Sequence, residues 1–152
     1  MRSLSALATA SFILFGGALA FGHGGEPFGE PGDLKGPSRA VTIVMQEREN
    51  GDMVYVPDAV EVKLGEQIRF ILRNQGKVDH EFVLGTEHDI DEHALLMQKF
   101  PEMEHDEPNM KRVQPGAEGE LVWRFSVAGE FDFACLIPGH IEAGMFGSIK
   151  VK

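Results

Sequence analysis

The sequence has a single cysteine, Cys135, and few basic residues. One thiol cannot close an internal disulfide, so Cys135 is an intermolecular partner, a reactive group or a metal ligand. Only 14 Lys and Arg residues stand against 24 Asp and Glu residues, for a formal net charge of −10. This acidic balance argues against nucleic acid as a partner. Long apolar runs are also scarce. The clearest one lies within the first twenty residues.

Residues 1–20 have the pattern of a secretory signal peptide. Arg2 provides a short basic start, an apolar run extends from Leu4 to Leu19, and Ala20 completes a small-x-small cleavage site. The alternative is a transmembrane anchor, but the run is marginal in length and rich in small residues. We therefore expect a periplasmic protein with no membrane-spanning segment after processing.

The rest of the chain has the length of one domain. Residues 21–38 are rich in Gly and Pro and show no apolar period, which predicts a flexible tail. From residue 39 onward, apolar and polar residues alternate in short segments separated by turns, as is typical of an all-β sandwich. The eight predicted strands are 40–45, 53–56, 59–64, 67–74, 81–84, 120–125, 129–134 and 148–151.

Residues 86–110 interrupt this alternation with an insertion within the 39–152 domain that is rich in acidic residues, His and Met. The stretch from Asp91 to Phe100 predicts a short helix, because acidic residues open it and Pro101 follows its end. We expect this insertion to lie at one end of the sandwich.

Cys135, His140 and Met145 follow one another at even five-residue steps near the C-terminus. A thiolate, two imidazoles and a weak axial thioether form the ligand set of blue-copper electron-transfer sites, so this loop lacks only a second histidine. His80, 55 residues upstream of the cysteine, is the candidate. Gly139 and Gly144 each stand next to a ligand and permit the tight backbone path that such a loop needs.

Purely structural roles and a zinc site both fit this loop less well than copper does. Cys135 as a small buried hydrophobe, His140 as a surface residue and Met145 as core filler would each be ordinary alone, but not as a set. A zinc site is disfavoured because Met is a poor zinc ligand and the chain has no paired cysteine spacing. Copper is therefore the predicted metal.

The C-x4-H-x4-M loop, the segment from Val78 to Phe82 and the segment from Val62 to Asn74 resemble the cupredoxin family, the plastocyanin and azurin type of copper protein. The resemblance covers about residues 40–152. It implies a Greek-key β-sandwich with one type 1 copper site, in which His80, Cys135 and His140 are equatorial ligands and Met145 is the axial ligand. The four-residue gaps resemble rusticyanin-like and auracyanin-like members. One departure is Glu81, where many members carry Asn or Ser to tie the ligand loops together.

Additional copper sites are a second hypothesis. Thioethers select Cu(I), so the methionines of the insertion could bind a further ion with its histidines. Alternatively, these methionines pack and the acidic residues are solvated surface. The candidate residues are His93, Met97, Met103, His105 and Met110. If cleavage follows Ala20, His23 becomes the third residue and could complete an amino-terminal Cu(II) chelate.

Within the family, the acidic insertion together with the segment from Ala134 to His140 most resembles bacterial periplasmic cupredoxins associated with copper tolerance. We therefore expect a monomeric protein of copper tolerance or handling, with a copper-handling protein or redox partner. The alternative is a one-electron carrier between respiratory or photosynthetic partners, docking through apolar residues around His140. We do not expect an enzyme beyond electron transfer or Cu(I) oxidation, because the chain has no His-x-His pair of the kind that multicopper enzymes need.

Overall fold

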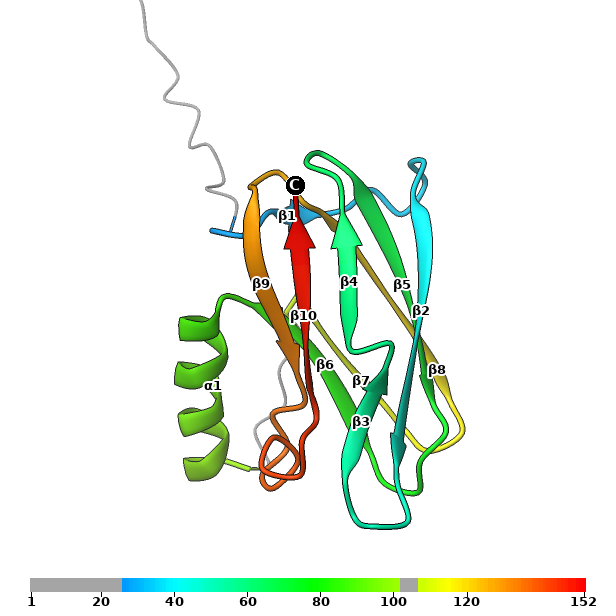
Figure 1. Cartoon of the computed structure of the whole chain (residues 1–152), viewed down its shortest axis with the longest axis vertical. Coiled ribbons are helices and arrows are strands. Elements are labelled where there is room, and N and C mark those ends of the chain that lie inside the picture. The colour runs from blue at the N-terminus through cyan, green and yellow to red at the C-terminus, as the bar shows by residue number, and fades with distance from the viewer. Residues whose placement is uncertain (1–25, 102–106) are drawn as a thin grey trace, which may run out of the picture.

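The computed structural model describes residues 26–101 and 107–152. Within them, ten strands and one helix form a sandwich of two five-stranded sheets (Figure 1). The helix of this described part lacks the length and apolar character needed to cross a membrane. The predicted signal peptide, His23, Met103 and His105 lie outside the described residues.

The first sheet has the strand order β1-β8-β5-β2-β3. Strands β2 and β5 are parallel, and the other neighbours in this sheet are antiparallel. The strands are β1 (Glu30–Pro31), β2 (Arg39–Glu47), β3 (Met53–Val56), β5 (Gln67–Asn74) and β8 (Glu118–Arg124).

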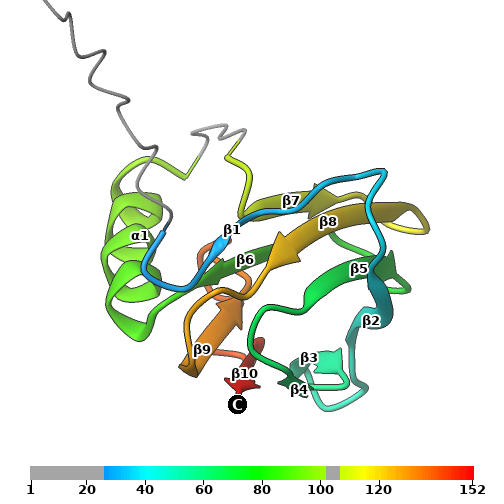
Figure 2. The same ribbon diagram turned by 90° about the horizontal axis from the view of Figure 1, so that it is seen from above.

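The second sheet has the order β4-β10-β9-β6-β7, with β4 and β10 parallel. Figure 2 shows it packed across from the first sheet, with the helix on its outer side. These mixed sheets confirm the predicted β-sandwich. The strands are β4 (Ala59–Val62), β6 (His80–Gly85), β7 (Met110–Val113), β9 (Gly129–Ala134) and β10 (Phe146–Val151).

The core between the sheets follows from the two-residue period of the strands. In β5, Ile68, Phe70 and Leu72 are fully buried at alternate positions, as expected for side chains on one face of a strand. Phe82 of the facing sheet lies with its ring centroid 5.0 Å from that of Phe70 and 4.9 Å from that of Phe133. Burying each such side chain contributes about 1.5–3 kcal/mol, so this aromatic layer holds the two sheets together.

The prediction that residues 21–38 form a flexible tail is wrong for residues 26–38. Phe28 is 1 % exposed and its ring stacks on Trp123 at a centroid distance of 5.0 Å. Strand β1 then pairs with β8, with Pro31 opposite Trp123. Gly29 has φ +139°, and a Cβ there would collide with the carbonyl oxygen of Arg124. Glycine is needed at position 29 because the backbone there passes close to β8. The buried Phe28 ring anchors the segment on the sandwich.

The helix α1 (Glu87–Lys99) begins four residues before the predicted start. Thr86 is the N-cap: its hydroxyl oxygen accepts from the Asp89 backbone N–H at 3.2 Å, and the Asp89 carboxylate accepts from the Thr86 backbone N–H at 3.0 Å. This capping box fixes the start. After the insertion, β7 returns the chain to the second sheet beside β6. Strands β1 and β7 are the two that the sequence did not predict.

Candidate metal centre

His80 is the first residue of β6 and is fully buried. Its ring has a different partner on each side. Nδ1 lies 3.3 Å from Nδ1 of His140, and Nε2 lies 3.0 Å from Oε1 of Glu47. Strand β6 therefore places the His80 imidazole at the end of the sandwich, and the two ring contacts fix its orientation.

The loop between β9 and β10 contributes the other predicted ligands. Cys135 directly follows β9, and Met145 directly precedes β10. The Cys135 backbone N–H donates to the Met145 carbonyl at 3.1 Å, and the Met145 N–H donates to the His140 carbonyl at 3.0 Å. Gly139 and Gly144 have φ values of +90° and +94°, as the predicted tight loop requires. These bonds fix the positions of the loop's ligands relative to one another.

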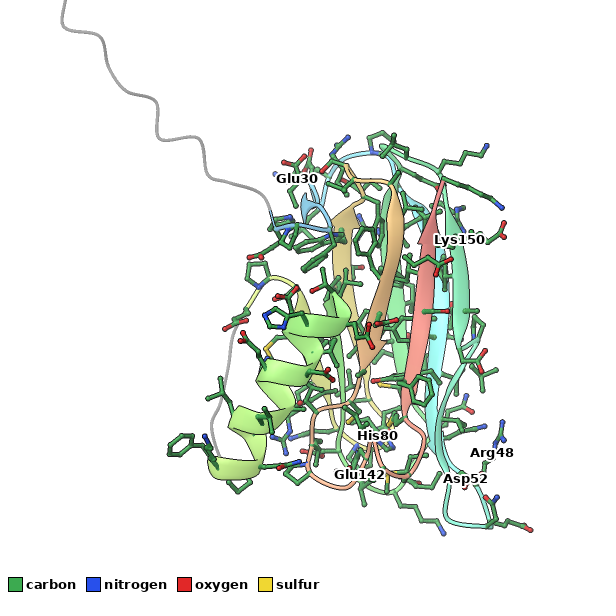
Figure 3. The ribbon with its side chains drawn as sticks, turned by 60° about the vertical axis from the view of Figure 1, so that its left-hand side comes forward. Glu30, Arg48, Asp52, His80, Glu142 and Lys150 are labelled. Atoms are coloured by element: carbon green, nitrogen blue, oxygen red, sulfur yellow. The ribbon has the colours of Figure 1, made fainter. Side chains whose placement is uncertain are left out.

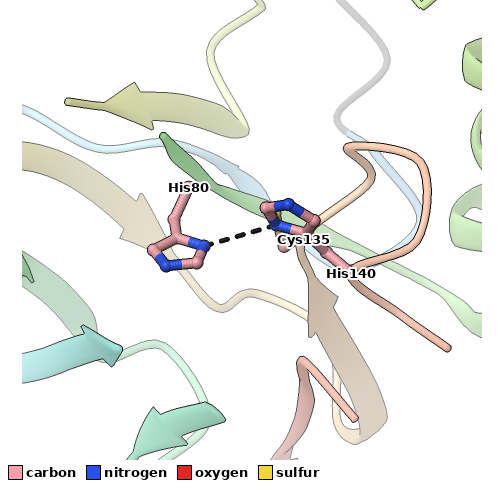
Figure 4. Close-up of side chains that lie close together, drawn as sticks. All are labelled: His80, Cys135 and His140. Carbon is pink, nitrogen blue, oxygen red and sulfur yellow. Dashed lines mark hydrogen bonds between the residues drawn. The ribbon is translucent and has the colours of Figure 1, made fainter. Parts of the chain in front are cut away.

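Three side chains converge at this end of the molecule (Figure 4). The donor atoms of His80, Cys135 and His140 all lie within 4.8 Å of one another. The thiol sulfur of Cys135 is 3.1 Å from Nδ1 of His140. Met145 is fully buried and belongs to the same hydrophobic cluster as Cys135. The structure thus brings three of the four predicted ligand side chains together, and backbone hydrogen bonds join the fourth residue, Met145, to Cys135 and His140.

Burial sets the protonation of these groups. It lowers the pKa of His80, and burial together with the neighbouring His80 ring lowers the pKa of His140. Burial raises the pKa of the Cys135 thiol to about 12. At neutral pH both imidazoles are therefore uncharged and offer a lone pair. The thiol keeps its proton until a cation displaces it.

This donor set fits copper. One thiolate and two imidazoles with a nearby thioether are the ligands of type 1 copper, and the thioether would be a poor choice for zinc. His80, Cys135 and His140 would hold the ion, with Met145 as the weak fourth donor. The site is also dry, because the most exposed of these four side chains, His140, is only 8 % exposed.

Hydrogen bonds around the ligands come from Glu81 and from Asn74, for which the sequence predicted no role. The backbone N–H of Glu81 donates to the Cys135 sulfur at 3.3 Å, so this contact does not depend on the side chain at that position. The Glu81 carboxylate lies 3.8 Å from the guanidinium of Arg112. The buried Asn74 side chain joins the Val78 and Val113 carbonyls, each at 2.8 Å. Asn74 therefore ties the segment before His80 to a neighbouring strand.

Glu47, at the end of β2, is the other contact that the sequence missed. Its carboxylate accepts from the backbone N–H of Lys77 at 2.8 Å and contacts the His80 ring. These hydrogen bonds keep the pKa of Glu47 below its usual range, although partial burial opposes them. The only signal in the sequence was an acidic residue at a strand end, and 33 residues separate it from His80.

Met97 and Met110 of the insertion pack in a second hydrophobic cluster under α1. Met97 is 1 % exposed and Met110 is 9 % exposed, and both contact apolar residues of the second sheet's outer face. His93 lies on the same helix and is partly buried. Packing accounts for the positions of Met97 and Met110, while copper binding by the insertion stays a prediction.

Comparison with known proteins places this site in a family. A family model described as copper binding proteins of the plastocyanin/azurin family matches residues 42–152. The copper-resistant cuproprotein CopI of Rubrivivax gelatinosus is 46 % identical over 126 residues, covering 83 % of this chain and 74 % of that protein. The CopI of Pseudomonas aeruginosa is 36 % identical, covering 92 % of this chain and 91 % of that protein.

The fold agrees with this relationship. The structure of auracyanin B superposes with a TM-score of 0.66 at 20 % identity, covering 82 % of this chain and 96 % of that one. Auracyanin from Roseiflexus castenholzii superposes with a TM-score of 0.61 at 22 % identity, covering 77 % and 99 %. With the buried His80, Cys135 and His140 cluster and the match over most of its length, the chain belongs to the plastocyanin/azurin family of copper-binding proteins.

Proposed function

We propose that this protein takes part in copper resistance by holding copper at the His80, Cys135, His140 and Met145 site. The observation that carries the proposal is the complete buried ligand set in a chain that is 46 % identical to a copper-resistant cuproprotein. Bound copper would supply a centre that exchanges one electron between Cu(I) and Cu(II). The protein would then act by binding and electron transfer and not as an enzyme on an organic substrate.

The ligands suit both oxidation states. Thiolate and thioether sulfurs favour Cu(I), whereas imidazole nitrogens also hold Cu(II). Cys135 and Met145 are joined through their backbones, and His80 is held by a strand of the same sheet, so the donors change position little when the charge of the ion changes. This rigidity supports a centre that would exchange one electron with a redox partner protein while its ligands move little.

We place this activity in the periplasm, because residues 1–20 have the charge and apolar pattern of a signal peptide. A periplasmic cuproprotein meets copper before the ion reaches the cytoplasm. Amino-terminal sequencing or mass spectrometry of the secreted protein tests this point. A mature chain that still begins at Met1 would argue against it.

The partner would dock at the end of the sandwich that carries the ligand loop, where Figure 3 places His80 and Glu142. Phe146 is 62 % exposed beside Met145, and Val78 is 42 % exposed near His80. A groove of ≈ 350 Å³ separates the loop from α1, with Asp91 and Glu142 among its lining residues. An apolar surface edged by carboxylates supports a partner that presents apolar and basic side chains. That partner would be a copper-handling or redox protein, and this protein would bind it as a monomer.

Growth on copper tests the copper-resistance role. A strain lacking this protein should grow normally without added copper and fail at copper concentrations that the parent tolerates. The wild-type gene should restore growth, and the His140→Gln gene should not. His88→Gln is the matched control, because His88 is exposed on α1 and lies away from the ligand cluster. Equal copper tolerance of the deletion strain and its parent would contradict the proposal.

Electron carriage is the second candidate, and the exposed Phe146 beside the ligand loop favours it. Self-exchange between reduced and oxidised protein, measured by NMR, needs no identified partner. Phe146→Ser should slow self-exchange while the visible spectrum stays unchanged, since Phe146 lies outside the ligand set. Added salt should speed the wild-type exchange, because two acidic molecules repel less when screened. Exchange unaffected by Phe146→Ser would argue against electron transfer through this surface.

A further inference from the structure

We propose that Glu47 is a positioning residue that fixes the tautomer of His80, so that the copper-facing nitrogen is free of a proton before metal arrives. This inference rests on the proposed copper site and deepens it. It concerns a residue in the other sheet, 33 positions away from the ligand in sequence.

The Glu47 carboxylate receives hydrogen bonds from more than one group. Oε1 lies 3.0 Å from Nε2 of His80, and it also accepts from the backbone N–H of Val78 at 3.3 Å. Oε2 accepts from the backbone N–H of Lys77 at 2.8 Å. The backbone N–H groups of Lys77 and Val78 can only donate, so both carboxylate oxygens already act as acceptors. An ionised carboxylate, which accepts and cannot donate, suits this position.

The tautomer of His80 follows from this arrangement. A carboxylate cannot donate, so Nε2 must carry the hydrogen that it shares with Glu47. In the neutral ring the lone pair is then on Nδ1, the atom that lies 3.3 Å from Nδ1 of His140 and faces the ligand cluster. A carboxylate behind a ligating histidine sets the ring's orientation and basicity.

The same bonds hold the backbone that carries the ligand. Lys77 and Val78 come shortly before His80, and their N–H groups are bound by Glu47 while Asn74 binds the Val78 carbonyl. Glu47 is the last residue of β2, which belongs to the first sheet, whereas His80 begins β6 of the second. One side chain therefore links the two sheets at the ligand and fixes both the ring and its backbone.

Glutamine cannot replace Glu47 in this role. It has one oxygen and one NH2 group, so one of the approaching donors would meet another donor. If the NH2 group faces His80, Nε2 must accept, and the ring hydrogen moves to Nδ1, where it points at the metal position. If the oxygen faces His80, the NH2 group opposes the Lys77 N–H. Either arrangement disfavours the His80 tautomer with a free lone pair on Nδ1, although Gln and Glu have nearly the same size.

Nitrogen-15 NMR of the metal-free protein tests the inference directly. The chemical shifts of the His80 ring nitrogens in the wild type should show a hydrogen on Nε2 and none on Nδ1. Glu47→Gln should shift this population towards the Nδ1-protonated form or a mixture of the two. The control is Glu49→Gln, which removes the same charge from an exposed position two residues later and should leave the His80 shifts unchanged.

Metal affinity gives an independent measurement. Cu(I) and Cu(II) titrations against competing chelators should show about 10- to 100-fold weaker binding in Glu47→Gln and wild-type binding in Glu49→Gln. If Glu47→Gln does not fold, the wild-type nitrogen shifts still decide the question. A wild-type His80 protonated on Nδ1, or a folded Glu47→Gln protein that matches Glu49→Gln in shifts and affinity, would overturn the inference. Neither measurement depends on growth in copper, so failure of the resistance proposal would leave this test intact.

Discussion

Asn74 donates a hydrogen bond from its side-chain amide to the carbonyl oxygen of Val78 at 2.8 Å, two residues before the ligand His80. The same amide nitrogen reaches the Val113 carbonyl at 2.8 Å, and the amide oxygen accepts from the Gly76 N–H at 2.8 Å. Asn74 is 2 % exposed, so no bulk water can take its place. One buried side chain thus closes the turn between β5 and β6 and secures it to β7.

Replacing this side chain should loosen the turn. We expect Asn74→Ala to lower the free energy of unfolding by about 1–3 kcal/mol, because buried carbonyls lose their donors. Asn50→Ala should have a much smaller effect, since Asn50 makes its side-chain bond to Asp52 at the exposed turn between β2 and β3. Urea unfolding of the metal-free proteins measures both. Equal stabilities of the two variants would contradict the role assigned to Asn74.

The N-terminal segment should contribute to stability through Phe28. Phe28→Ala removes a ring that is 1 % exposed and stacked on Trp123, so the expected loss is about 3–5 kcal/mol. Leu34→Ala is the control, because Leu34 is 66 % exposed in the same segment. Thermal and urea unfolding measure the difference. A loss below about 1 kcal/mol for Phe28→Ala would mean that the segment is not docked on the sandwich.

The helix should depend on Met97 for its attachment. Met97→Ala leaves a cavity beneath α1 and should cost about 2–5 kcal/mol, whereas Leu95→Ala on the exposed side should cost little. Hydrogen exchange of the α1 amides would show where the loss occurs. Faster exchange confined to α1 in Met97→Ala is expected. Unchanged exchange and stability would indicate that Met97 does not hold the helix to the sheet.

Asp132 should make stability depend on pH. Partial burial, with the negative charges of Glu87, Glu130 and Asp91 nearby, raises the pKa of Asp132. The folded state therefore prefers the protonated form, and its ionisation destabilises the fold as pH rises through the folded pKa. Asp132→Asn should be more stable than the wild type at pH 7, by less than about 1 kcal/mol because solvent screens the site.

This advantage of Asp132→Asn should shrink as pH falls through the folded pKa and vanish below the unfolded pKa. Urea unfolding at several pH values measures the difference. Asp58→Asn is the control, because it removes the same charge from an exposed position in the β3–β4 turn. An Asp132→Asn advantage that grows as the pH falls would contradict the sign of the shift.

The sequence predicted the ligands better than their surroundings. Cys135, His140 and Met145 lie in one loop, so their spacing alone identified them, and the alternation of apolar and polar residues predicted the β-sandwich. The contacts of Asn74 and Glu47 join residues that are distant in sequence, and no local pattern records them. The burial of Phe28 was missed for a similar reason. Its Gly- and Pro-rich surroundings predict a flexible tail, and its stacking partner Trp123 is distant in sequence.

The central claim is that His80, Cys135, His140 and Met145 form one type 1 copper site. Copper analysis with visible absorption and paramagnetic resonance on the processed protein tests it most directly. We predict an intense visible band from a Cu–thiolate bond in the wild type, present in the Glu49→Gln control and absent in Cys135→Ser. Copper that binds without this band, or a band that persists in Cys135→Ser, would contradict the account.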